Sequence, residues 1–153
     1  MSDKSHRIDR ELAALRSALH ELLCKLGTLL EDIAEADVDE FCYQPAVPIE
    51  DVPQILHELA CKLRDLFDLE EDERHLSALS QHRPELRVRF EELNAEHPQL
   101  LDQLEYLHEL AGTSTCPTST WDDIDHHYRG LERRLIDHRR NEELILAQAG
   151  SPI

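Results

Sequence analysis

Glycine is scarce in this chain, which has only four glycines among its 153 residues. Leucine, glutamate, arginine and alanine, all good helix formers, are abundant instead, and 41% of the residues are hydrophobic. This balance is typical of a helical protein and argues against a β-sheet protein or a disordered tail. Because a chain of this length can bury a core of its own, we expect one all-α domain over residues 1–153.

Basic residues are also in short supply. The chain has 16 lysines and arginines against 33 aspartates and glutamates, a formal net charge of -17. Such a charge excludes nucleic acid and anionic membrane as partners unless a basic face is segregated from the rest. The arginines of residues 129–140 are interleaved with acidic residues, which indicates a solvated mixed face. We therefore expect no nucleic-acid or membrane partner, and an acidic surface that could bind a protein partner.

Several motifs with recognisable chemistry are absent. No cysteine pair is spaced C-x-x-C, no glycine-rich phosphate loop is present, and nothing resembles a nucleophile with its base. No apolar run is long enough to span a membrane, and the opening MSDKSHRIDREL does not resemble a signal peptide. We therefore expect a cytoplasmic protein with reduced thiols. The absence of these motifs favours a protein that is not an enzyme.

The chain does contain four stretches in which apolar residues recur every three or four positions. This spacing places them along one side of a helix. Residues 34–51 lack the period and contain Pro45 and Pro48, so they are interpreted as a long connection. A local kink is expected at Pro98, which cannot donate an amide to the carbonyl of Asn94. The pattern predicts an up-down-up-down four-helix bundle with helices at about 6–33, 52–79, 84–111 and 121–149.

Four polar residues occupy stripe positions where leucine is expected, namely Glu70, His97, His138 and Glu142. Counted from the turns between the helices, all four fall within about two helical turns of one height. An unpaired carboxylate in a core is costly, so such a group of residues needs either a cation or a network of mutual hydrogen bonds. Imidazole and carboxylate ligands together suit iron, manganese or zinc.

The same residues resemble the hemerythrin-like (HHE cation-binding) domain. The resemblance is carried by LFDLEE at 66–71, EHPQLL at 96–101, and Asp137-His138 followed by NEEL at 141–144. It covers nearly the whole chain in helix order and loop placement. It implies a four-helix bundle that holds a di-iron centre, in which Glu70 is similar to a bridging carboxylate and His97 and His138 to histidine ligands.

The match to the family pattern is incomplete. Leu66 and Leu101 stand at two histidine positions, and leucine cannot bind a metal. On the fourth helix the family's acidic ligand is often at the position of Glu143, whereas the apolar stripe favours Glu142. On the first helix the only interior candidate is His20, one residue off the stripe. The resemblance thus implies a reduced site for one or two iron ions, with Glu70, His97, His138, Glu142 and His20 as candidate ligands.

Three functions fit these observations. The first is a metal-binding hemerythrin-like module, most simply with iron, that senses or stores iron, oxygen or nitric oxide. The second is a metal-free bundle with a degenerate site, in which Leu66 and Leu101 fill a dry core and the acidic surface serves protein interaction or regulation. The third is an oxidase or peroxidase that uses one iron, which requires an open coordination position and a substrate path that no motif indicates.

Overall fold

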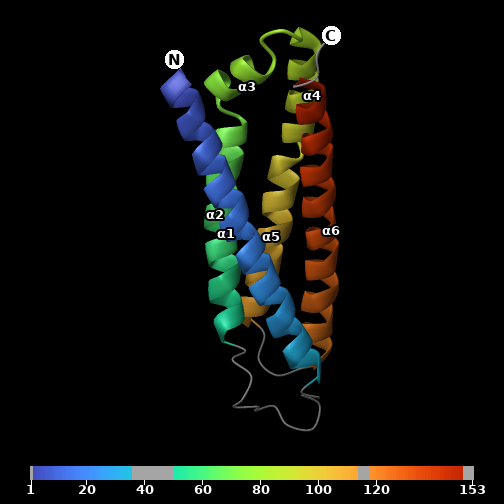
Figure 1. The fold of residues 1–153 in the computed structure, drawn as a ribbon. Coiled ribbons are helices and arrows are strands. Elements are labelled where there is room, and N and C mark those ends of the chain that lie inside the picture. Colours follow the sequence, from blue (N-terminus) through green and yellow to red (C-terminus); the bar gives the residue numbers. More distant parts are fainter. Residues whose placement is uncertain (1, 36–49, 114–117, 150–153) are drawn as a thin grey trace.

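The computed structural model describes residues 2–35, 50–113 and 118–149 and shows an all-α protein (Figure 1). The helices are α1 (Ser2–Glu35), α2 (Asp51–Glu70), α3 (Glu73–Leu79), α4 (Pro84–Asn94), α5 (His97–Thr113) and α6 (Thr118–Ala149). Helices α1, α2 and α6 are long and continuous, while α4 and α5 follow one another along a fourth rod (Figure 1). The short α3 joins α2 to α4 at one end.

Successive rods of the bundle run antiparallel (Figure 1). Helix α1 packs on α2, α2 on α5, α5 on α6, and α6 also contacts α1, so the four rods enclose a common interior. The predicted all-α class is confirmed, while most of the predicted connection, residues 36–49, lies outside the described residues. None of the described helices is long and apolar enough to cross a membrane.

The helix predicted over residues 52–79 is wrong as one continuous helix, because α2 ends at Glu70 and α3 begins at Glu73. Asp72 lies between them in extended backbone, and its side chain accepts hydrogen bonds from the amides of Arg74 at 2.8 Å and His75 at 3.3 Å. Such an N-cap satisfies amides that have no partner at a helix start. The cap therefore stabilises a new helix after Glu70 and leaves Glu70 at the end of α2.

The helix predicted over residues 84–111 is interrupted near the expected kink. Helix α4 ends at Asn94 and α5 begins at His97. Pro98 has no amide hydrogen and cannot bond to the carbonyl of Asn94, so a continuous helix would lose a hydrogen bond here. The helical pattern resumes with the amide of Leu100, which donates to the carbonyl of Glu96 over 3.1 Å. His97 consequently opens α5 and is buried.

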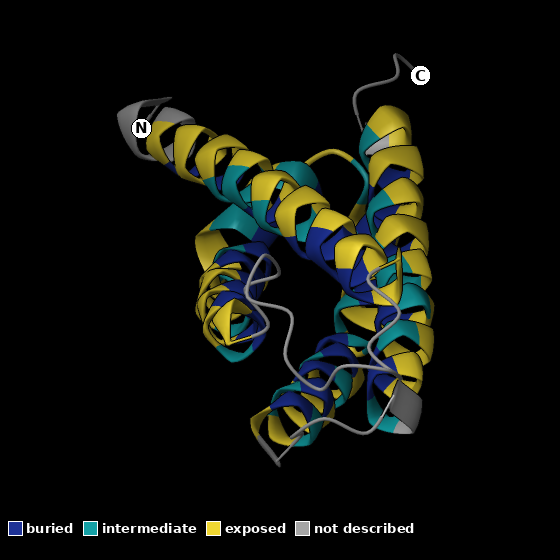
Figure 2. Cartoon of the chain, turned by 90° about the horizontal axis from the view of Figure 1, so that it is seen from below, coloured by how far each residue is buried: buried dark blue, intermediate teal, exposed yellow. Residues whose placement is uncertain are grey.

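The bundle interior contains two apolar clusters with a polar layer between them. The large core fills the space between α1, α2, α5 and α6, and buried faces of these helices turn towards one another in Figure 2. The end cluster lies where α3 and α4 meet α6 and consists of Leu76, Leu86, Phe90, Leu93 and Ile145. Along α2, the α4–α5 rod and α6, the polar residues lie between the segments that contribute to the two clusters: Glu70, His97, His138 and Glu142.

Tyr128 joins α6 to α1 within the large core. Its side chain is fully buried, and its hydroxyl donates a hydrogen bond to the backbone carbonyl of Leu23 over 2.8 Å. Burial raises the pKa of the phenol above its ordinary value, and the nearby Glu132 carboxylate raises it further. The hydroxyl therefore keeps its proton and remains a donor at every physiological pH.

Candidate metal centre

Three helices bring the buried polar side chains together. Glu70 is the last residue of α2, His97 is the first residue of α5, and His138 lies within α6. All three are at most 5% exposed. The interruptions at residues 71–72 and 95–96 end α2 and begin α5 at the same height of the bundle. Two residues at helix ends therefore meet one from a helix interior.

The donor atoms of these residues, hereafter the donor cluster, lie within contact of one another. His97 Nε2 is 3.1 Å from Glu70 Oε1 and 3.2 Å from His138 Nε2, and His138 Nε2 is 3.7 Å from Glu70 Oε1. Zinc-type bonds of about 2.0–2.2 Å in tetrahedral geometry place two ligand atoms about 3.3–3.6 Å apart. The separations in the donor cluster are thus close to those around one bound ion.

Each histidine of the donor cluster is held from behind by a carboxylate. His97 Nδ1 donates to Glu71 Oε2 at 2.6 Å, and His138 Nδ1 donates to Glu96 Oε1 at 2.8 Å. An ionised carboxylate only accepts hydrogen bonds, so the proton of each neutral ring is on Nδ1. The same pairing orients histidine ligands in metal sites, because it fixes the ring and leaves the other nitrogen free to bind.

This tautomer places three electron-pair donors opposite one another. When both rings are neutral, the Nε2 atoms of His97 and His138 carry no proton, and both lie near Glu70 Oε1. That oxygen is buried and has no hydrogen bond to any described residue, although His97 Nε2 is close to it. An unpaired buried carboxylate oxygen is costly. The arrangement requires a cation at this point, either a metal ion or a proton.

Apolar side chains surround the donor cluster. The ring of Phe67 stacks on the ring of His97, with centroids 3.6 Å apart and planes inclined by 5°. Leu66 is buried in the large core, and Leu101 is partly buried against it. These two positions, where the resemblance would place histidines, therefore contribute packing and no ligand atoms.

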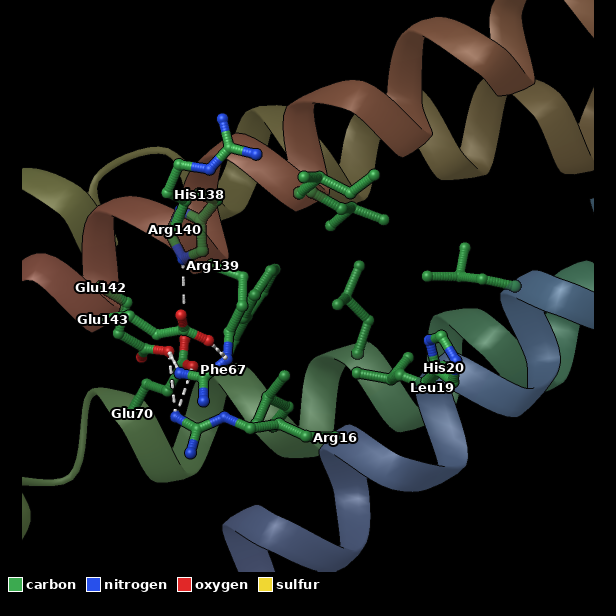
Figure 3. Close-up of a pocket in the computed structure, with 15 residues that line it drawn as sticks. Arg16, Leu19, His20, Phe67, Glu70, His138, Arg139, Arg140, Glu142 and Glu143 are labelled. Atoms are coloured by element: carbon green, nitrogen blue, oxygen red, sulfur yellow. Dashed lines mark hydrogen bonds and ion pairs between the residues drawn. The ribbon is translucent and has the colours of Figure 1, made fainter.

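A positive charge lies beside the donor cluster. Arg16 of α1 reaches the interior, where its Nη2 donates to Glu142 Oε1 at 3.0 Å and lies 3.5 Å from Glu70 Oε2 (Figure 3). Arg139 Nη1 also donates to Glu142 Oε1, at 2.6 Å. Glu70 thus faces the two histidines with one oxygen and the guanidinium with the other, while Glu142 is held between two arginines.

The structure separates the remaining candidate ligands. Glu142 is buried next to the donor cluster, as the apolar stripe predicts, whereas Glu143 is exposed and pairs with Arg139. His20 is exposed and lies away from the cluster (Figure 3). Its Nε2 is 3.6 Å from Cys24 Sγ. The neighbouring Leu19 takes the buried position, so the helical stripe turns His20 outward. Helix α1 contributes Arg16 rather than His20.

Charges in the polar layer shift three pKa values. Burial raises the pKa of Glu142 to about 7, and the adjacent Glu70 adds to the rise. Burial would also raise the pKa of Glu70, but contacts with His138, His97 and Glu142 outweigh it and lower that pKa well below its ordinary value. Burial alone lowers the pKa of His138, yet the nearby carboxylates of Glu70 and Glu96 raise it overall. The donor cluster therefore attracts positive charge.

Sequence reasoning missed Arg16, Glu71 and Glu96. The two glutamates carried a signal, because each is next in sequence to a residue of the donor cluster. Arg16 follows Leu15 at the edge of the first stripe, and only its long side chain allows it to reach the interior.

Comparison of the chain with protein-family models, curated proteins and solved structures finds no match. The structure shows a helical bundle with a buried cluster of Glu70, His97 and His138 that could hold a metal ion.

Proposed function

We propose that this protein is a hemerythrin-like bundle that binds a single transition-metal ion, iron in the cell, through Glu70, His97 and His138. Its role on this proposal is to sense or store iron, oxygen or nitric oxide. The observation that carries the proposal is the convergence of the Nε2 atoms of His97 and His138 with a buried carboxylate oxygen of Glu70 that has no hydrogen bond to any described residue. Imidazole with carboxylate is a donor set that iron, manganese and zinc accept.

Three features support one ion rather than two. Leu66 and Leu101 provide no donor atoms. The second oxygen of Glu70 faces the Arg16 guanidinium, which already supplies a positive charge at that side. Glu142 accepts hydrogen bonds from Arg16 and Arg139. A second metal ion would have to displace these arginines and would find few ligands.

Bound iron would supply a redox-active centre with coordination positions that the protein leaves open. The residues around it have separate tasks. Glu71 and Glu96 hold the two imidazoles in the tautomer that can bind, Phe67 fixes the ring plane of His97 by stacking, and Arg16 balances the charge of Glu70 and Glu142.

A metal-free regulatory module is the second candidate, and Arg16 is the observation that favours it. The guanidinium gives both buried carboxylates a positive partner without any metal. A proton shared between His97 and His138 would then complete the network, since their Nε2 atoms are 3.2 Å apart. On this alternative the acidic surface carries the function.

The metal content of the purified protein separates the two candidates. Protein made in iron-supplemented medium should contain about one equivalent of metal, and His138→Ala should lose it. His126→Ala is the matched control, because His126 lies on the same helix, is exposed, and is remote in sequence from His138. A ligand present at a hundred times its dissociation constant stabilises the folded state by about 2.7 kcal/mol. A metal-free wild type whose melting temperature ignores Fe(II), Mn(II) and Zn(II) would refute the metal site.

A further inference from the structure

A cavity of about 440 Å³ adjoins the donor cluster between α1, α2 and α6. Figure 3 shows its two ends: the charged side chains around Glu70 and His138 lie at one, and His20 lies at the other. Its walls between them are apolar and include Leu19, Leu23, Leu63 and Leu66. A concave, mainly apolar site of this size with a few polar groups at one end is characteristic of a small-molecule site.

The charged end of the cavity would carry an excess of positive charge once a metal ion is bound. Arg16, Arg139 and Arg140 balance Glu70, Glu142 and Glu143 in number along its wall. A divalent ion in the donor cluster would leave this end with an excess of positive charge. Arg16 Nε is also buried and has no acceptor among the described residues. The first feature favours a negative ligand group over an ammonium group, and the second favours a group that accepts hydrogen bonds.

The shape of the cavity sets the rest of the ligand. On α1 its lining runs from Arg16 to Leu23, and on α2 from Leu63 to Glu70. The two ends of each span are seven positions apart, or about 10 Å along the helix. A branched or bulky polar molecule would leave the leucine walls unpaired with apolar surface, whereas an alkyl chain would cover them.

We propose that this cavity binds a straight-chain monocarboxylate, with its carboxylate at the Glu70–His138 end between the metal ion and Arg16, and its alkyl chain along the leucines towards His20. The proposal rests on the proposed metal site, because the metal supplies the excess positive charge. The cavity also gives the ligand a path to the donor cluster, which no motif in the sequence indicates.

Calorimetric titration of the zinc-loaded protein with decanoate, below its critical micelle concentration, tests the proposal. Zinc is chosen because it has no redox chemistry. Each buried methylene contributes about fourfold in affinity, so octanoate should bind about fifteenfold more weakly than decanoate. Decanol, which lacks the charge, and decanoate with metal-free protein should each bind at least tenfold more weakly. Equal affinity of decanol and decanoate, or of the zinc-loaded and metal-free proteins, would overturn the proposal.

Two tryptophan substitutions on α1 locate the ligand. Leu23 lines the cavity. Its neighbour Leu22 packs against the large core and does not line the cavity. Leu23→Trp should weaken decanoate binding at least tenfold, and Leu22→Trp should change it less than twofold. Leu135→Trp fills the cavity from α6 and replaces Leu23→Trp as the filling variant if Leu23→Trp does not fold. Equal effects of the filling and control variants would refute the location. Failure of the protein to take up zinc, measured separately, refutes the metal site itself.

Discussion

Glu142 should make the metal-free protein less stable as the pH rises towards neutrality. Burial first, and the adjacent Glu70 second, raise its pKa from 4.5 to about 7 in the folded state. Between these two pH values the folded protein holds a proton that the unfolded chain releases. The contribution of Glu142 to stability is therefore fully present below pH 4.5 and is lost as the pH rises through about 7. Glu142→Gln removes this titration.

The size of the effect follows from the two pKa values. One proton changes the free energy of unfolding by about 1.4 kcal/mol per pH unit over the interval in which only the folded state holds it. The interval from 4.5 to about 7 bounds the total at about 3.4 kcal/mol. We expect about 2 kcal/mol, because water that enters with the ionised carboxylate relieves part of the cost of burial.

Urea unfolding of chelator-treated protein between about pH 5 and 8 measures this difference. The free energy of unfolding of the wild type should fall relative to Glu142→Gln by about 2 kcal/mol as the pH rises across this range. All other residues are the same in both proteins, so the comparison reports the titration of Glu142 together with its effect on the adjacent Glu70. Glu143→Gln, the exposed neighbour, should run parallel to wild type. A wild type and Glu142→Gln that differ by the same amount at every pH would refute the reasoning.

Three further substitutions test the surroundings of the site. Glu71→Gln removes the charged acceptor of His97 Nδ1 and should weaken metal binding about 10- to 100-fold in a chelator competition; an unchanged affinity would deny this carboxylate its role. Arg16→Met leaves Glu142 with one ionic partner fewer and should destabilise the metal-free protein by about 3 kcal/mol in urea, but the zinc-loaded protein by less; equal losses in both forms would contradict the charge balance. Tyr128→Phe removes the hydrogen bond from the hydroxyl to the Leu23 carbonyl and should cost about 1 kcal/mol in urea with no change in metal affinity; a change in affinity would mean that this bond acts on the site.

Burial was predictable from the sequence because it follows helical period. The apolar stripes place Glu70, His97, His138 and Glu142 in the interior, and the structure buries all four. The same argument explains the failure at His20, since it sits one position from the buried Leu19 and turns outward. The helical period fixes the direction in which a side chain leaves its helix. That direction is enough to identify a residue as a candidate for the site.

Contacts made by long side chains were not predictable in this way. Arg16 lies at the flank of its stripe, and its reach to two carboxylates depends on how α1 approaches α2 and α6. The end of α2 depended on local hydrogen bonding at Asp72, which competes with continuation of the helix and leaves no mark on the apolar period. Both features concern short-range polar geometry, which the apolar period does not encode.

The polar layer divides the protein into two units of unequal size. The end cluster of α3, α4 and the last turns of α6 is small, and it meets the large core across charged side chains instead of continuous apolar packing. Local opening costs least where few apolar contacts must break. The amides of this end should therefore exchange with solvent through openings smaller than global unfolding. A metal ion held by Glu70, His97 and His138 would fasten α2, α5 and α6 at the boundary, so that filling the site would slow this exchange.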